Sequence, residues 1–201
     1  MNKFPSELEN LWQKLESQSH EFWNIGRTSA ELLFLLVKSI KARRILEIGT
    51  SNGYSGLWFA RALYEVQKEG GDMSQALLIT VESHSGRFAL AAEHFEGSGL
   101  KDFIFQVQGH APEILAQIPE IQAETFDLIF IDATKMEYLN YFQAVSALLK
   151  SGGLLIADNV RSHRQAMANF LGFVEQDSQW DSVTLPVDAG LLILRKKYFT
   201  N

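Results

Sequence analysis

The stretch FDLIFIDATK occupies residues 126–135, and the rest of the chain is best understood outward from it. Its first six residues are apolar except Asp127, and they lead directly into Asp132, with Lys135 three positions later. A short apolar run of this kind predicts a strand that is buried on both faces of a sheet. A polar side chain that follows such a strand lies at its carboxyl end, where open α/β sheets bind ligands.

A second apolar run, residues 154–157, ends in the pair Asp158-Asn159. Because neighbouring parallel strands end at the same edge of a sheet, we expect Asp132, Asp158 and Asn159 to lie together, with Lys135 beside them. Two carboxylates and an amide oxygen suit a hard divalent cation, and an amine nearby can serve as a base. The alternative is that each aspartate caps the helix after it. The position of Asn159, directly after Asp158, favours the cation site.

Composition limits the classes of function. A chain of 201 residues, 46% hydrophobic, predicts one domain with a substantial core. The net charge of −6 argues against a nucleic-acid partner, and the absence of cysteine excludes disulfides and thiolate chemistry. Glu7, Glu9 and Glu16 interrupt the N-terminal apolar residues, which predicts neither a signal peptide nor a membrane span. We therefore expect a soluble, cytoplasmic protein.

The apolar pattern predicts an α/β fold. Residues 6–22 and 28–40 show helical spacing, and strands then alternate with helices. The expected strands are 44–48, 76–81, 103–107, 126–131 and 154–157, and the expected helices are 54–67, 86–96, 112–117, 136–149 and 163–175, with a surface loop at 68–75. This alternation indicates a doubly wound parallel sheet with helices on both faces. Residues 180–186 and 190–195 are too close for a crossover and predict an antiparallel hairpin, which reverses one strand.

The first strand-to-helix turn reads EIGTSNGYSG at residues 47–56. Its glycines allow close approach of a ligand to the backbone, and the following helix start attracts an anion. A dinucleotide fingerprint requires glycine where this chain has Ser51, so a smaller anion, such as an amino-acid carboxylate with Ser55 as donor, fits better. Glu82 ends the second strand, where an acid can accept both hydroxyls of a ribose; alternatively it is a solvated strand-end charge.

Taken together, these motifs resemble the cation-dependent O-methyltransferases, a family that includes catechol and caffeoyl-CoA O-methyltransferases and small bacterial members. The resemblance rests on EIGTxxGYS at 47–55, Val81-Glu82, FDLIFIDxxKxxY at 126–138, Gly152-Gly153 and Asp158-Asn159, and it extends from about residue 25 to 197. It implies a single Rossmann-like domain over residues 1–201, with N-terminal helices in 1–41 and a catalytic core in 42–197. The implied sheet has seven strands in the order 3-2-1-4-5-7-6, with strand 7 antiparallel.

The resemblance also implies S-adenosylmethionine as methyl donor and a role for each matching residue. Lys135 would be the general base, and Asp132, Asp158 and Asn159 would bind the cation, with Mg²⁺ expected first and Ca²⁺ or Mn²⁺ as alternatives. Residues implied to form the donor site are Glu47, Gly49, Gly53, Ser55, Glu82 and Asp132. His110 stands near the expected adenine position, where many relatives have an acid, and it is either an adenine contact or an exposed loop histidine.

Other features concern the acceptor and partners. The chain is expected to run from Asn159 directly into the next helix, and Arg161, His163 and Arg164 suggest the hypothesis of an acidic acceptor. Trp23 is either a wall of the pocket or, as we expect, a buried packing residue. Residues 32–37 are apolar beyond the needs of one core contact, which fits a homodimer.

The predicted function is thus cation-dependent methylation of a hydroxyl on a small catechol-like or other vicinal-oxygen acceptor, with no nucleic-acid or membrane partner. One alternative is a protein that binds S-adenosylmethionine without turnover, or a methyltransferase for another acceptor. A less favoured alternative is a nucleotide-dependent oxidoreductase, against which Ser51 and the three oxygen ligands argue.

Overall fold

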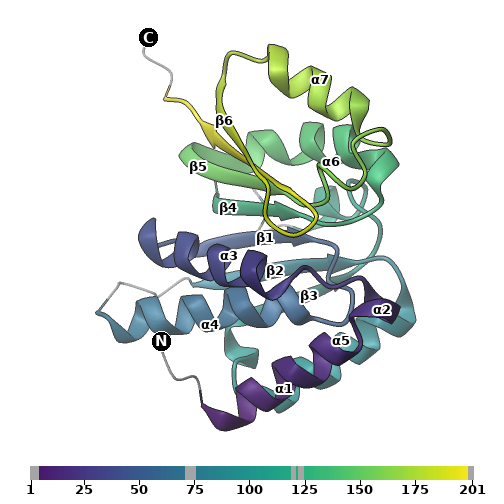
Figure 1. Ribbon diagram of the computed structural model, residues 1–201. Coiled ribbons are helices and arrows are strands. Elements are labelled where there is room, and N and C mark those ends of the chain that lie inside the picture. Colours follow the sequence, from purple (N-terminus) through teal and green to yellow (C-terminus); the bar gives the residue numbers. More distant parts are fainter. Residues whose placement is uncertain (1–4, 71–75, 119–120, 122–124, 199–201) are drawn as a thin grey trace.

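The computed structural model describes residues 5–70, 76–118, 121 and 125–198 (Figure 1). In this part of the chain, one seven-stranded sheet has the order β3-β2-β1-β4-β5-β7-β6. The strands are β1 (Arg44–Ile48), β2 (Leu77–Glu82), β3 (Ile104–Gln108), β4 (Phe126–Ile131), β5 (Leu149–Ala157), β6 (Trp180–Leu185) and β7 (Leu191–Lys196). Strands β1 to β5 pair in parallel, and β7 is antiparallel to both β5 and β6. The predicted fold class and strand order are confirmed.

Alternating residues of each strand face two separate cores, because successive side chains of a strand point to opposite faces. On one face, Ile45 and Leu128 pack against α1 (Ser6–Ser17), α3 (Arg27–Ser39), α4 (Tyr54–Lys68) and α5 (Ser85–Gly97). On the other, Leu46 and Ile129 pack against α6 (Tyr138–Val145) and α7 (Ala168–Gln176). Figure 1 shows these helices on the two sides of the sheet. The sheet edge that carries the functional residues is therefore held by a core on each face.

The N-terminal region differs from the predicted single helix over residues 6–22. Helix α1 ends at Ser17, and a short helix α2 (Ser19–Phe22) follows. The stack of Trp12 on Trp58, with ring centroids 4.0 Å apart, anchors α1 to α4. Asn24 donates a hydrogen bond back to the Leu15 carbonyl at 2.9 Å, which folds the chain after α2 over the end of α1. This return path brings residues 22–25 to the functional edge of the sheet.

Two further helix predictions were wrong in their bounds. Over residues 112–117 the chain forms turns and one 3-10 turn (Leu115–Gln117), and Ile118, which precedes Pro119, is extended as residues before proline tend to be. The helix predicted at 136–149 is shortened to α6, with 3-10 turns at Lys135–Glu137 and Ser146–Leu148 on either side. Part of the predicted loop, residues 71–75, lies outside the described residues.

The segment after Asn159 is also longer than predicted, because α7 begins only at Ala168. The backbone amides of Val160, Arg161 and Ser162 donate to the carbonyls of Ala189 and Gly190, in the turn between β6 and β7. These three bonds hold residues 160–162 against the hairpin, so the chain follows the turn before α7 begins.

Most of the apolar side chains at residues 32–37 pack into the core of the same chain. Leu33, Phe34 and Val37 are buried in the core, whereas Leu35 is 58% exposed. Among the described residues, no helix has the length and apolar character required to cross a bilayer.

Candidate active site

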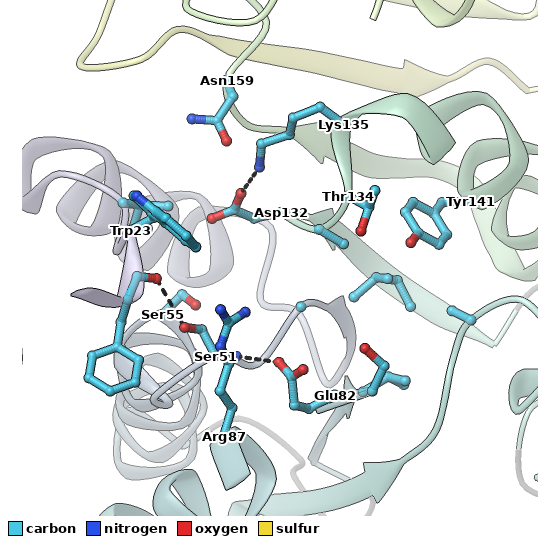
Figure 2. Close-up of a pocket in the computed structure, with 18 of the residues that line it drawn as sticks. Trp23, Ser51, Ser55, Glu82, Arg87, Asp132, Thr134, Lys135, Tyr141 and Asn159 are labelled. Carbon is cyan, nitrogen blue, oxygen red and sulfur yellow. Dashed lines mark hydrogen bonds and ion pairs between the residues drawn. The ribbon is translucent and has the colours of Figure 1, made fainter. Parts of the chain in front are cut away.

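A cavity of about 500 Å³ lies at the carboxyl ends of the parallel strands. Its walls come from residues 22–25, which we call the cover segment, the glycine turn after β1, the ends of β2 to β5, and Tyr141 of α6. Figure 2 shows labelled side chains from the cover segment, the glycine turn, the ends of β2, β4 and β5, and α6 around the same space. The predicted residues that line it are Gly49, Ser55, Glu82, His110, Asp132, Lys135 and Asn159. Glu47, Gly53 and Asp158 do not line it.

The glycine turn is shaped by contact with the neighbouring strand end. Gly49 has a φ of 105°, and a Cβ at this position would overlap the backbone carbonyl of Asp132. Gly53, with a φ of 88°, precedes α4, and its Cβ would lie 2.8 Å from the ring of Phe95. Both positions therefore require glycine, one to bring β1 and β4 together at the cavity and the other to seat α4 behind it.

Glu82 lines the cavity, and two backbone amides hold its carboxylate in one orientation. The backbone amide of Ser51 donates to Oε2 at 2.8 Å, and the amide of His84 donates to Oε1 at 2.8 Å. The side chain is 6% exposed, so these two bonds compensate for lost hydration. Each oxygen keeps a lone pair for a further donor, which is what a pair of ribose hydroxyls would need.

Glu47 is placed behind the cavity and not in it. It is fully buried, and it accepts hydrogen bonds from Ser55 Oγ and Thr80 Oγ1, both at 2.6 Å. Burial raises the pKa of Glu47 to about 7, although the two hydroxyl donors lower it. Glu47 thus positions Ser55. While Ser55 donates its hydroxyl hydrogen bond to Glu47, its oxygen can accept a bond from the cavity side; its predicted role as a donor to a carboxylate stays a prediction.

Asp132 and Lys135 meet as expected from their spacing. Lys135 Nζ donates to Asp132 Oδ1 at 2.7 Å, and both side chains line the cavity, as Figure 2 shows. The backbone explains their position, because Asp132 continues β4 with its amide bonded to the carbonyl of Ile48. Asn159 follows β5 with a φ of 65° and turns its side chain toward the same part of the cavity.

Asp158 is a buried carboxyl group with one unpartnered oxygen, which is compatible with a cation ligand. Its Oδ1 is buried and has no hydrogen-bond partner among the described residues. Burial first, and then the negative charge of Asp132, raises the pKa of Asp158 to about 7. No group of three His, Cys, Asp or Glu in the described part of the chain could hold a metal ion, so the predicted set depends on Asn159 as its third ligand. Two carboxylates with an amide oxygen fit a hard cation.

His110 lines the cavity between two glutamates. Its Nδ1 lies 2.7 Å from Glu113 Oε2, and its Nε2 lies 3.1 Å from Glu137 Oε2. The hydrogen bonds to Glu113 and then to Glu137 raise the pKa of His110. Glu137 also accepts from the hydroxyl of Tyr141 at 2.5 Å. His110 is thus an exposed loop residue, as one of the predicted alternatives had it, and it also forms part of a charged rim of the cavity.

Trp23 forms part of the cavity wall, the predicted alternative that was not preferred: it is 73% exposed, with its ring 5.7 Å from the Arg87 guanidinium. The sequence interpretation missed Arg87 and Tyr141, which also line the cavity. Of the basic residues after Asn159, only His163 reaches the cavity. An αL backbone at Trp23 (φ 51°) turns the chain there, and no local pattern signals this.

Comparison with known proteins agrees with this geometry. The profile of a family described as O-methyltransferase matches residues 3–197. The catechol O-methyltransferase of Niastella koreensis is 39% identical over 137 residues, which are 68% of this chain and 58% of that protein. Caffeoyl-CoA O-methyltransferase 1 of Eucalyptus globulus is 29% identical, over 96% of this chain and 84% of its own length. An O-methyltransferase from Bacillus cereus, solved in complex with SAH, has a TM-score of 0.82 and 27% identity, over 98% of this chain and 93% of that one. As its motifs predicted, the chain belongs to the O-methyltransferase family.

Proposed function

We propose that the protein transfers a methyl group from S-adenosylmethionine to a hydroxyl of a small acceptor with two neighbouring oxygens, such as a catechol, and that it requires a divalent cation. The observation that carries the proposal is the meeting of the Asp132–Lys135 pair with Asn159 at the cavity wall, next to the unpartnered oxygen of Asp158. The SAH in the related Bacillus cereus structure supports the choice of donor.

Asp132, Asp158 and Asn159 would hold the cation, with Mg²⁺ expected first. When bound, such an ion acts as a Lewis acid that favours the ionised hydroxyl and orients the acceptor. The two carboxylates balance its charge, and the Asp158 oxygen gains the partner that it lacks within the chain. The Asp132–Asp158 repulsion, which contributes to the raised pKa of Asp158, would be relieved at the same time.

Lys135 would take the proton that the acceptor hydroxyl loses. Its Nζ lies in the cavity, 2.7 Å from Asp132 Oδ1, and the amine has to be in its neutral form to accept. As the bond from the acceptor oxygen to the methyl carbon forms, the bond from that carbon to the donor's sulfur breaks, so the positive charge of the sulfonium disappears. Holding the two reactants together in this cavity would supply a large part of the rate increase.

The donor would occupy the side of the cavity formed by the glycine turn and Glu82. Glu82 has a free lone pair on each oxygen for the ribose hydroxyls. The α-carboxylate of the donor suits the N-terminus of α4, where the helix dipole is positive. Ser55, which presents an acceptor, and the carboxylate of Asp132 suit the donor's α-ammonium group.

The test is an assay of methyl transfer from S-adenosylmethionine to catechol, with Mg²⁺ and with a chelator. We expect turnover to stop with the chelator and to return with excess Mg²⁺. Lys135→Ala should lower kcat by roughly 10²- to 10⁴-fold. Lys150→Ala is a matched control, because Lys150 makes the same 2.7 Å bond to Asp127 but lies outside the cavity. Turnover unaffected by the chelator or by Lys135→Ala would refute the proposal.

A nucleotide-dependent oxidoreductase is the alternative from another class of enzyme. The cavity offers no glycine at position 51, where Ser51 has a φ of 50° and uses its amide to hold Glu82. A calorimetric titration with NAD and with S-adenosylmethionine separates the two, and tight binding of NAD alone would favour the alternative.

A further inference from the structure

The turn between β6 and β7, residues 187–190, lies outside the cavity but touches two of the segments that form its walls. It is closed by a bond of 2.7 Å from the amide of Gly190 to the carbonyl of Val187. Asp188 holds a φ of 45°, a left-handed conformation that is uncommon for residues other than glycine. None of its four residues lines the cavity. The turn therefore has no direct contact with a ligand there. The charge of Asp188 contributes to the raised pKa of Asp158, and the other effects of the turn on the site pass through its neighbours.

The first neighbour is the start of α3, which directly follows the cover segment. Asp188 Oδ2 accepts from the amide of Ser29 at 3.0 Å and from its hydroxyl at 2.7 Å. A carboxylate at this position satisfies a free amide of the first helical turn and interacts favourably with the helix dipole. A Cβ on Gly26 would overlap the Asp188 carboxyl group. The backbone of Gly26, directly after the cover segment, therefore lies in close contact with the Asp188 side chain.

The second neighbour is the segment that follows Asn159. The amide of Val160 donates to the Gly190 carbonyl at 3.1 Å, and the amides of Arg161 and Ser162 donate to the Ala189 carbonyl at 3.1 and 3.0 Å. Three successive backbone bonds fix this segment onto the turn. Asn159 and His163, on either side of the bonded residues, both line the cavity.

We propose that Asp188 is a positioning residue, which locks the cover segment to the segment carrying Asn159 and His163 and so sets the distance between two walls of the cavity. Ser29 and Asp188 are 159 positions apart, and this contact connects the N-terminal cover to the C-terminal hairpin. Asp188 is itself exposed, so its truncation removes the link without opening a hole in the core. Only the turnover measurement in the test below depends on the proposed function; the exchange measurement does not.

The experiment compares Asp188→Ala, Asp188→Asn and Asp177→Ala. Asparagine keeps an oxygen that can accept both bonds from Ser29. Asp177 is the matched control, because it also holds a turn through bonds to the Gln179 amide and the Trp180 ring nitrogen, but lies away from the cavity. Hydrogen–deuterium exchange of the protein alone is measured first. In Asp188→Ala we expect faster exchange in residues 22–29 and in 159–163, with wild-type rates in Asp188→Asn and in Asp177→Ala.

Binding of S-adenosylhomocysteine and turnover are measured next. Asp188→Ala should raise the KM values by about tenfold or more, since small displacements of a site are costly. Asp188→Asn should restore them, and Asp177→Ala should leave them unchanged. Unchanged exchange in both segments, or equal KM effects in Asp188→Ala and Asp177→Ala, would overturn the proposal. Absence of turnover in the wild type would count against the proposed function alone, because the exchange result would still decide the role of Asp188.

Discussion

Replacement of Glu47 by glutamine should make the stability of the protein less dependent on pH. Glu47 is fully buried, and its pKa is raised from the ordinary 4.5 to about 7. The neutral form fits its surroundings, since Ser55 donates to one oxygen while the protonated oxygen can donate to Thr80, whose hydroxyl lies 2.6 Å from that of Thr50. Glutamine can make the same bonds without titrating.

The magnitude follows from the shift in pKa. Because the folded value lies above the unfolded one, the contribution to stability is fully present below pH 4.5 and is lost as the pH rises through about 7. The difference between the folded and unfolded pKa values, at 1.36 kcal/mol for each unit, corresponds to a loss of roughly 3 kcal/mol in the free energy of unfolding at high pH. For a chain of this size, that corresponds to a change of roughly 6–12 °C in Tm.

The assay is urea unfolding of the wild type and Glu47→Gln at pH 5 and pH 8. We expect Glu47→Gln to be more stable than the wild type by less than about 1 kcal/mol at pH 5 and by roughly 3 kcal/mol at pH 8. Asp158 titrates in the same range but contributes equally to both proteins. Glu93→Gln, an exposed change on α5, is the control and should follow the wild type. Parallel pH profiles for the wild type and Glu47→Gln would refute the reasoning.

Three further predictions concern the cavity. Gly49→Ala should destabilise the protein by about 1–3 kcal/mol or more in urea unfolding, because φ is 105° and the new methyl meets backbone, whereas Gly172→Ala on the open face of α7 should be neutral or stabilising. NMR titration should give His110 a pKa above 6.5 that falls in Glu137→Gln, and equal values in both proteins would contradict its place between two carboxylates. Saturation with S-adenosylhomocysteine should change the fluorescence of the exposed Trp23, and the same change in Trp23→Phe would place the ligand elsewhere.

Much of the fold could be predicted because its signals are local. The apolar runs that end in Asp132 and Asp158 identify β4 and β5, and their parallel pairing follows from the βα alternation. The path of residues 160–162 could not be predicted, because it depends on hydrogen bonds to the carbonyls of Ala189 and Gly190, far away in the sequence. Tertiary hydrogen bonds of this kind leave no local pattern.

The residues of the candidate site also fall into those that local sequence signals predict and those that depend on tertiary packing. Residues at strand ends, such as Glu82 and Asp132, reach the cavity because strand direction alone places them there. Trp23 and Arg87 reach it through the fold of the cover segment and the seating of α5, which depend on packing. The role of Glu47 also needed the structure, since only the pairing of β1 with β2 brings Thr80 beside it.

The central claim is that the side chains of Asp132, Asp158 and Asn159 bind one divalent cation. Calorimetric titration of Mg²⁺ into the protein saturated with S-adenosylhomocysteine tests this most directly, with Asp158→Asn as the variant and Asp177→Asn as the control. We predict one site for the wild type and the control, and a loss of at least about tenfold in affinity for Asp158→Asn. Equal affinity in all three proteins, or no binding by the wild type, would contradict the claim.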